Sequence, residues 1–292
     1  AMLARWTGDV PRALVMHADP LSAYAYRWFG TMASRETIDR GFAWFWRHLK
    51  RLKQRYDQII VANSGLAQRL EEGGLHKIVL NPMGVEEGIF SPALRSAELR
   101  RSMLAQCNLG EDATLLVAAG RLAPEKRLPM LIKAVTRAGY SRPVGLMLLG
   151  EGRAQAEVMR AIGGNPHIRL LPPIRDRALF AHWLASADAL IHGCEAETFG
   201  MVAVEARASG LPMIVPDSGG ARDQLNEGAG FAYRAADPRS LQRAIANFLD
   251  ADRDAMRGAA GQAALSVRGM GQHFDALFAG YAGLLERRRQ AA

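Results

Sequence analysis

Residues 195–206 read Glu-Ala-Glu-Thr-Phe-Gly-Met-Val-Ala-Val-Glu-Ala and follow a short apolar run that ends near His192. An apolar run followed by an amphipathic stretch predicts a strand, a loop and a helix that begins at Phe199 or Gly200. Glycine lets the backbone approach a ligand closely, and the first-turn N–H groups of a helix have no partner inside the helix. The stretch therefore predicts an anion-binding helix end that suits a diphosphate.

The two glutamates of this stretch have two interpretations. Glu197 lies in the predicted loop and Glu205 inside the predicted helix, where ionised carboxylates can accept hydrogen bonds from sugar and ribose hydroxyls. In the plainer interpretation, one glutamate caps the helix and the other lies on a solvated face. The spacing alone gives both interpretations equal weight.

Outward from this stretch, short apolar runs alternate with longer amphipathic ones, a pattern typical of βα units and a parallel sheet. The runs hold Val, Ile and Leu without strict polar alternation, which indicates strands covered on both faces. We predict strands at Ala13–His17, Gln58–Ala62, Lys77–Leu80, Thr114–Ala118, Gly145–Leu149, Ile168–Leu171, Ala189–His192 and Met213–Val215. We predict helices at Asp39–Arg55, Leu66–Glu72, Ala97–Gln106, Leu128–Ala138, Ala154–Ala161, Arg175–Ser186, Gly200–Ala208 and Leu241–Phe248, with two or more further helices up to Arg289.

The clearest break in composition is the segment 81–92, which is rich in Pro, Gly and acidic residues. We place a domain boundary there, between two doubly wound units. Residues 1–90 are expected to form the first domain and residues 91–270 the second, with residues 271–292 as a helix that crosses back to the first. Ligands of such sheets bind beyond the carboxyl ends of the strands, where the candidate residues of this sequence lie.

A second candidate site, residues 119–126, reads Ala-Gly-Arg-Leu-Ala-Pro-Glu-Lys directly after a predicted strand. Arg121 and Lys126 lie on a strand-to-helix turn, where two cations can clamp a diphosphate. The alternative is a pair of solvated surface charges, which is the commoner role of Arg and Lys on a turn. The diphosphate interpretation gains support because these cations and the Glu197 loop follow strands of the same predicted sheet.

Composition narrows the class of protein. The 292 residues carry 37 Lys and Arg against 29 Asp and Glu, and the formal charge of +8 favours anionic partners. An apolar fraction of 49% with 23% charged residues is ordinary for a globular protein and argues against a disordered or fibrous chain.

Cys107 and Cys194 lack metal-ligand spacing, so we expect neither a disulfide scaffold nor a zinc site. No membrane-spanning run or signal peptide is evident, and we expect a cytoplasmic protein.

Residues 42–56 mix Trp and Phe with six basic side chains, His48 included, which suits a helix in a membrane interface. Peripheral contact with the inner face of a membrane is therefore one interpretation. We favour the alternative, in which the aromatic side chains pack inside the first domain and the basic face is solvated. We expect no nucleic-acid partner, because no recognition module accompanies the basic residues.

Together, residues 120–126, the Glu-x7-Glu spacing from Glu197 to Glu205 and the sequence Ala-Ser-Gly-Leu-Pro at 208–212 resemble retaining glycosyltransferase family 4, of GT-B fold. Upstream, Asn-Ser at 63–64 and the segment 81–92 resemble the passage from the first to the second domain of that family. The resemblance implies an α/β fold with two Rossmann-like domains, each built on a parallel sheet. It also implies a nucleotide-sugar donor held by the second domain, with no metal ion and no cofactor.

Carried over by position, the resemblance places Arg121 and Lys126 on the diphosphate of the donor. It places Glu205 on the ribose hydroxyls and Glu197 beside the donor sugar. The implied catalytic set is therefore Glu197, Arg121 and Lys126, together with a histidine of the first domain.

That histidine is His17, which resembles the family residue that reaches the sugar from the first domain. Without the resemblance, a single His at the end of a strand is more often a structural residue. The backbone of Phe199, Gly200 and Met201 would meet the sugar and the phosphate. Ile174, in the loop 172–175, would meet the nucleobase.

The implied activity is transfer of a hexose from a UDP-, GDP- or ADP-sugar to a hydroxyl of a glycan or lipid-linked acceptor, with retention of configuration. Polysaccharide or lipopolysaccharide biosynthesis would use such a reaction. Two other classes stay open: another GT-B enzyme, such as an epimerase or a phosphorylase, and a non-catalytic protein that binds sugar nucleotides or serves in assembly.

The sequence also departs from the family. We expect three strands in the first domain and find no glycine-rich loop before them, so we expect an incomplete first domain, and the activity of this chain alone is an open question. The strand Ala13–His17 would then leave an edge open, and we expect self-association or a second polypeptide that completes the domain. Arg127 stands where the family often has Gly, and Ala221 to Asp223 stand where it often has Glu.

Overall fold

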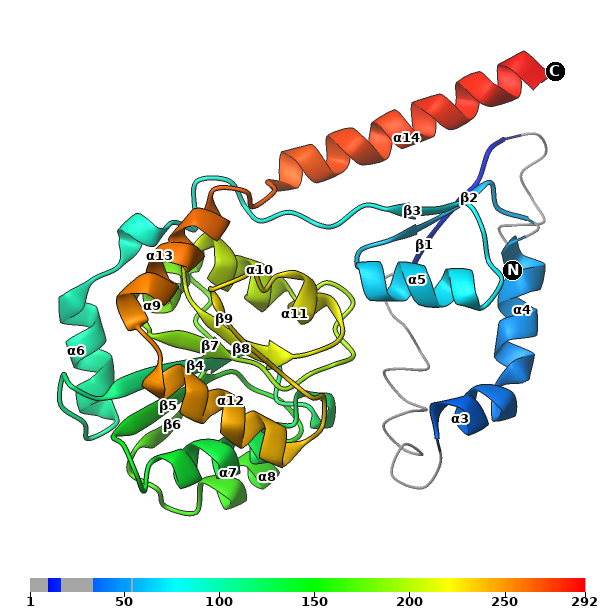
Figure 1. Cartoon of the computed structure of the whole chain (residues 1–292). Coiled ribbons are helices and arrows are strands. Elements are labelled where there is room, and N and C mark those ends of the chain that lie inside the picture. Colours follow the sequence, from blue (N-terminus) through cyan, green and yellow to red (C-terminus); the bar gives the residue numbers. More distant parts are fainter. Residues whose placement is uncertain (1–9, 17–33, 54, 292) are drawn as a thin grey trace. The chain divides into compact units, whose positions relative to one another are not determined.

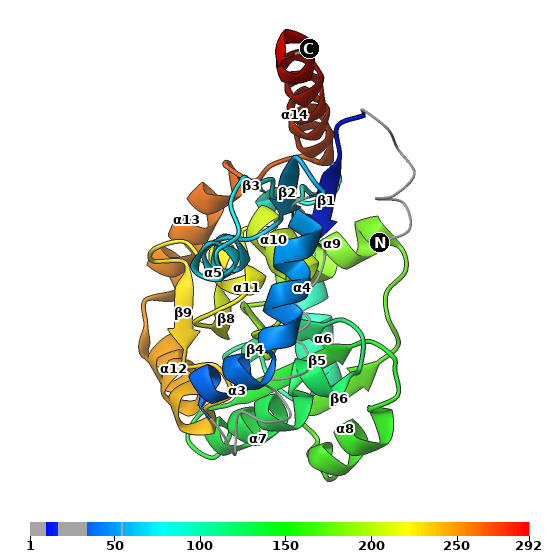
Figure 2. The same ribbon diagram turned by 90° about the vertical axis from the view of Figure 1, so that its right-hand side faces the viewer.

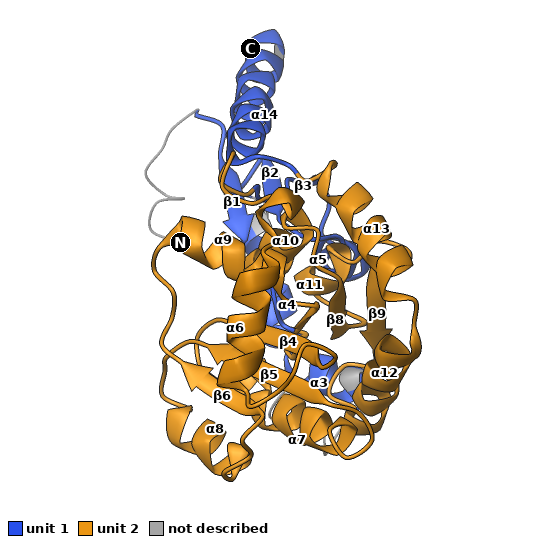
Figure 3. Ribbon diagram, turned by 90° about the vertical axis from the view of Figure 1, so that its left-hand side faces the viewer, with its two compact units in different colours: residues 1–84, 196–199, 268–292 blue, residues 85–195, 200–267 orange. Residues whose placement is uncertain are grey.

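The computed structural model describes residues 10–16, 34–53 and 55–291 (Figure 1). By its internal contacts, the chain divides into two compact units (Figure 3). The first comprises Ala1–Gly84, Ala196–Phe199 and Arg268–Ala292, and the second comprises Val85–Glu195 and Gly200–Val267. The domain limits expected from the sequence, at residues 90 and 270, stay a prediction.

The second unit is built on a six-stranded sheet with the strand order β6-β5-β4-β7-β8-β9, in which every neighbouring pair is parallel. Its strands are β4 Thr114–Ala119, β5 Val144–Leu149, β6 Ile168–Leu171, β7 Ala189–Ile191, β8 Met213–Pro216 and β9 Gly230–Tyr233. From β4, the strand order runs one way through β5 and β6, and the other way through β7, β8 and β9. Ligands of parallel sheets bind at such a reversal, so the loops after β4 and β7 are the place to look for a site.

Two layers of helices cover this sheet. The helices of the second unit are α6 Ala97–Gln106, α7 Leu128–Ala138, α8 Gln155–Ile162, α9 Arg177–Ser186, α10 Met201–Ala208, α11 Gly220–Asp223, α12 Pro238–Asp250 and α13 Arg253–Ala264, with short 3-10 turns at Pro92–Leu94 and Pro124–Lys126. On one face, Leu116 and Ala118 of β4 pack with residues of α7, α8 and α12 (Figure 2). On the other face, Leu115 and Val117 pack with residues of α6, α9 and α10.

The two buried faces explain why the strands read as apolar runs without polar alternation. Side chains of consecutive strand residues point to opposite faces, and here both faces meet helices. The α/β fold class with parallel sheets is confirmed, and in the second unit so is the expectation that helices cover both faces of the strands. In the first unit that expectation is wrong for the predicted strand Lys77–Leu80, because Val79 and Leu80 are 40% and 49% exposed.

The first unit has a smaller parallel sheet of strand order β1-β2-β3, formed by β1 Ala13–Met16, β2 Gln58–Val61 and β3 Ile78–Leu80. Its helices are α3 Arg35–Gly41, α4 Ala43–Lys53, α5 Ser64–Glu72 and α14 Met270–Ala291. Buried Ile59 and Val61 of β2 pack with Leu49 of α4 and with Leu66 and Leu70 of α5. This cluster is the core of the unit.

Among the described residues, β1 pairs with β2 alone and so lies at an edge of the sheet. Val15 is 38% exposed, whereas Leu14 is half-buried against the core. Association with another chain through this edge stays a prediction. The expected strand Ala13–His17 ends at Met16, and His17 itself lies outside the described residues.

Two expectations about secondary structure are wrong. A single helix was expected at Asp39–Arg55, but Phe42 ends α3 and a second helix, α4, begins at Ala43. Gly41, a poor helix former, is the signal that the expectation overlooked. Strand β9 was not predicted, because its four residues Gly-Phe-Ala-Tyr include none of the Val, Ile and Leu that mark the other strands; it forms by pairing with β8.

The aromatic residues of α4 differ in their surroundings. Phe45 and Trp46 pack against the core of the first unit, and the Arg69 guanidinium lies 5.7 Å from the Trp46 ring centre. Trp44 is 59% exposed, beside the exposed Arg47 on the same helix. Packing thus accounts for two of the three rings. No helix of the described part of the chain has the length and apolar character to cross a bilayer.

Candidate functional site

A small cavity lies at the carboxyl ends of the central strands of the second unit. Its lining includes Gly120 and Arg121 from the loop after β4, Lys126 from the same loop, and His192 and Gly193 from the loop after β7. Leucine side chains from β5 and α7 make up much of the remaining wall. The structure thus brings both predicted cations to the point where the strand order reverses.

Three glycines let the loops around this cavity touch through their backbones. A Cβ atom on Gly150, which follows β5, would overlap the carbonyl oxygen of Gly120. A Cβ atom on Gly193 would likewise overlap the carbonyl oxygen of Lys126. Gly120 itself has φ +134°, a conformation that side-chain-bearing residues rarely adopt. Only glycine therefore fits at these positions.

The two cations differ in how firmly they are held. The Arg121 side chain is 74% exposed, and its Nη2 lies 2.9 Å from Oε1 of Glu125. Lys126 is half-buried, and its Cε would lie 3.9 Å from a Cβ on Gly120, so its stem lies over that loop. Arg121 is thus a solvated surface charge in this structure, as the alternative interpretation expects. The Lys126 side chain, in contrast, is held against the loop that contains Gly120.

Arg127 and Glu195 join the two loops that flank the cavity. Arg127 has φ +48°, and its guanidinium makes a two-pronged ion pair with the Glu195 carboxylate, in which Nε donates to Oε2 at 2.9 Å. These hydrogen bonds raise the pKa of Arg127 and keep it charged. Sequence reasoning noted Arg127 only as a departure from Gly and missed its partner, which is 68 residues away. The ion pair fixes the loop that carries Lys126.

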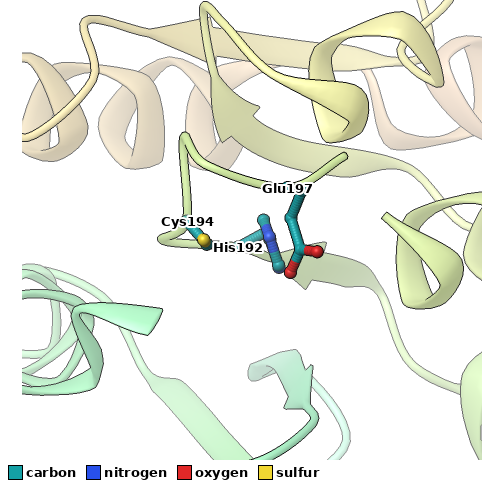
Figure 4. A group of neighbouring side chains, drawn as sticks. All are labelled: His192, Cys194 and Glu197. Carbon is teal, nitrogen blue, oxygen red and sulfur yellow. The ribbon is translucent and has the colours of Figure 1, made fainter. Parts of the chain in front are cut away.

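The strand end at β7 is held by a buried hydrogen bond. The Tyr233 hydroxyl, from the unpredicted strand β9, donates to the His192 carbonyl oxygen over 2.7 Å. The loop that follows carries three side chains of metal-ligand type, His192, Cys194 and Glu197 (Figure 4). Their ligand atoms lie within 4.8 Å of one another. The absence of a metal from the reaction accordingly stays a prediction.

The helix that we expect to begin at Phe199 or Gly200 begins at Met201. Gly200 precedes α10 with φ +80°, which a residue with a side chain would adopt only under strain. Met201 is the first helical residue and is half-buried, and Phe199 is buried. Ile174, which is also half-buried, packs on the sheet face that holds α9 and α10.

Glu205 lies in the middle of α10 and is not on a solvated face, because its side chain is only 7% exposed. Burial raises the pKa of the Glu205 carboxyl, and hydrogen bonding to Arg177 opposes the rise. Sequence reasoning missed Arg177, although it begins the helix that follows the predicted nucleobase loop. Among the described residues, those lining the cavity do not include Glu205, which forms a cluster with Arg177 and Glu86.

Comparison with known proteins gives a consistent result. The family described as glycosyl transferases group 1 matches residues 100–265, more than half of the chain. A GDP-mannose-dependent alpha-mannosyltransferase of Mycobacterium tuberculosis (strain CDC 1551 / Oshkosh) is 34% identical over 190 residues, which cover 65% of this chain and 46% of that protein. A D-inositol 3-phosphate glycosyltransferase of Streptomyces scabiei is 30% identical over 194 residues, covering 61% of this chain and 43% of that protein. The chain thus spans less than half the length of these curated relatives.

Solved structures share the fold. HepE of Anabaena, crystallised with UDP, superposes with a TM-score of 0.71 at 18% identity, covering 94% of this chain and 72% of that one. A sucrose-phosphate synthase of Thermosynechococcus elongatus superposes with a TM-score of 0.68 at 23% identity, covering 92% and 68%. These likenesses confirm the GT-B-like fold class. The family match over more than half of the sequence shows that the chain belongs to the glycosyl transferases group 1 family.

Proposed function

We propose that this chain is part of a retaining glycosyltransferase of family 4. The enzyme would move a hexose from a nucleotide-diphosphate sugar to a hydroxyl of a glycan or lipid-linked acceptor. The reaction would need no metal ion. The observation that carries the proposal is the cavity at the ends of β4, β5 and β7, which Arg121 and Lys126 both line. Two cations at the carboxyl ends of a parallel sheet suit a diphosphate, which would lie across the mouth of the cavity and not inside it. The relatives named for GDP-mannose and the neighbour solved with UDP support a nucleotide-sugar donor.

The reaction would be favoured by positive charge that is in position before the bond breaks. As the bond from the sugar to the diphosphate breaks, negative charge builds on the leaving phosphate oxygen. Cations and N–H groups aimed at that oxygen stabilise the transition state more than the bound donor, and so raise the rate. In this proposal, Lys126 and Arg121 meet the diphosphate, and Gly200 and Met201 at the start of α10 contribute backbone groups. Glu197 would lie by the sugar, and the proposal assigns His17, which is outside the described residues, to the same sugar.

The remaining contacts in the proposal go to the nucleoside. Glu205 accepts hydrogen bonds from the ribose hydroxyls, Ile174 lies at the base, and Phe199 lends its backbone to the sugar. The donor base would be uracil, guanine or adenine. The test is a thermal-shift screen over UDP-, GDP- and ADP-sugars and the free diphosphates, because a ligand of the folded state raises its apparent stability by mass action. No stabilisation by any of them would overturn the proposal.

The two glutamates give a sharper prediction. We expect Glu205→Gln to weaken binding of the free nucleoside diphosphate by about tenfold, because it loses a charged acceptor to two hydroxyls. Glu197→Gln should bind the free nucleotide normally and lower transfer, because its partner is the sugar. Titration calorimetry with UDP and GDP, together with a transfer assay, separates the two roles. Exposed Glu157 on α8 supplies the control, Glu157→Gln, which should change neither. Identical behaviour of the two variants in both assays would contradict this division of roles.

We also propose a cytoplasmic location, and contact of α4 with the inner face of a membrane is the alternative to a solvated basic face. Support comes from Trp44, whose ring is largely exposed beside Arg47 on α4. If this surface meets lipid, the protein should sediment with vesicles rich in anionic lipid, and Trp44→Ala should sediment less. Sedimentation that does not depend on Trp44 would remove the surface from consideration.

A further inference from the structure

Arg177 connects three parts of the second unit. It is the first residue of α9, and its Nη2 donates to Oε1 of Glu205 in α10 over 2.5 Å. Its Nε donates to Oε2 of Glu86 over 2.9 Å, from the segment that precedes α6. One guanidinium thus bonds both a buried carboxylate and an exposed one.

Two aromatic rings lie close to this guanidinium. Its central carbon lies 5.0 Å from the ring centre of Phe90 and 5.8 Å from that of Phe180. The two rings themselves meet edge to face, with their centres 6.4 Å apart. Stacking on aromatic rings is favourable for a guanidinium and limits its movement, so Arg177 has little freedom to turn away from Glu205.

Glu205 needs such a partner to stay ionised. A buried carboxylate loses most of its hydration, and this raises its pKa. Arg177, from α9, is the cation that opposes the rise, and Glu86 adds to the rise as a like charge. Without the guanidinium, burial and Glu86 would act together, and Glu205 would take up a proton at a higher pH.

We propose that Arg177 is a positioning residue for the nucleotide site. It keeps Glu205 ionised and turns Oε1 toward the guanidinium, so that Oε2 accepts the hydrogen bonds of the donor ribose. This inference rests on the proposed role of Glu205 at the ribose. Arg177 could instead have a purely structural role and only link α9, α10 and the Glu86 segment. In that case, replacing Arg177 would lower the stability of the fold but would not affect recognition of ribose.

The test compares Arg177→Met, which keeps the stem over the aromatic rings but removes the charge, with Arg177→Lys, which restores the charge. We expect Arg177→Met to bind UDP and GDP about tenfold more weakly near pH 7, with affinity that rises as the pH is raised, because Glu205 loses its proton only at a higher pH. Arg177→Lys should recover much of the affinity and should depend less on pH than Arg177→Met. Glu86→Gln, which removes only the exposed partner, should bind as the unmodified protein does.

Ligands without ribose hydroxyls separate positioning from mere support of the fold. Toward 2′,3′-dideoxy forms of UDP and GDP, the unmodified protein and Arg177→Met should have equal affinity. If Arg177→Met weakens the dideoxy and ordinary nucleotides alike, or its affinity does not depend on pH, the inference is overturned. Should Arg177→Met melt below the titration temperature, Arg177→Gln replaces it in the same comparison.

Glu205→Gln distinguishes failure of the inference from failure of the proposed function. If Glu205→Gln binds UDP and GDP normally, Glu205 does not hold the ribose and the proposed function fails at that residue. If Glu205→Gln weakens binding and Arg177→Met does not, Glu205 keeps its role and only the positioning role of Arg177 is lost.

Discussion

Replacing Lys126 with Ala is expected to lower the rate of sugar transfer by about 10²–10³-fold, the usual effect of removing one group that stabilises developing charge in a transition state. Lys126 lies over Gly120 at the wall of the cavity, and the Arg127–Glu195 ion pair fixes the loop that carries it. The same change should weaken binding of UDP or GDP by at least about tenfold, or about 1.4 kcal/mol. Transfer kinetics and titration calorimetry measure the two effects.

Lys133 supplies the matched control for Lys126. It lies on α7, seven residues further along the chain, and its side chain is exposed. Lys133→Ala should leave binding and transfer unchanged, since exposed charges contribute little. Arg121→Ala should have a smaller effect than Lys126→Ala, because Arg121 is mostly exposed and pairs with Glu125. Unchanged nucleotide affinity in Lys126→Ala would remove this cavity as the diphosphate site.

The largest loss of stability is expected for Asp188→Asn, at about 3–5 kcal/mol, the usual cost of removing one partner from a buried ion pair. The Asp188 side chain, just before β7, is 6% exposed and accepts two hydrogen bonds from Arg100, at 3.0 and 2.8 Å. It also accepts the backbone N–H of Leu115 at 2.8 Å and forms ion pairs with Arg95 and Arg257.

Three guanidiniums therefore share one carboxylate. Burial lowers the pKa of Arg257 to about 10, and the neighbouring Arg95 adds to that shift, so the cluster already holds more positive charge than its surroundings favour. Removing the carboxylate that pairs with all three leaves their mutual repulsion opposed only by the more distant charge of Asp254. Calorimetric unfolding of the variant measures the loss.

Asp250 provides the control for Asp188. It pairs with Arg142 at 2.5 Å, but the side chains of both residues are more than half exposed. Exposed pairs contribute about 0–1 kcal/mol, so Asp250→Asn should unfold close to the unmodified protein. A loss in Asp188→Asn no larger than that in Asp250→Asn would show that the three arginines are satisfied by backbone carbonyls alone.

Much of the fold is predictable because it depends on local chemistry. The central strands are apolar runs that two layers of helices cover, and Asp176 and Asp237 each cap the helix that follows them. Strand β9 is different, because its four residues acquire their structure from β8. The break between α3 and α4 falls at Phe42, and the one local sign of it is the preceding Gly41.

The candidate site likewise has residues that the sequence predicts and residues that it does not. Arg121, Lys126 and Gly200 follow strands directly, so their place at the strand ends could be predicted from their position in the sequence. Arg127 and Arg177 could not be assigned partners, because Glu195 and Glu205 lie 68 and 28 residues away along the chain. Such pairs depend on how strands are ordered in the sheet, and no short stretch of sequence records that order.

The glycines that pack backbone against backbone have a bearing on how this protein could be re-engineered. At Gly150 and Gly193, any side chain would overlap the backbone of a neighbouring loop, so these two positions are closed to variation. A library that aims at a new donor would have to vary side chains that meet the base instead, such as Ile174 in the proposed function. Arg121 would be kept, because its proposed partner is the diphosphate that these donors share. Substitutions of side chains can thus change which donor binds, while the backbone around the glycines keeps its conformation.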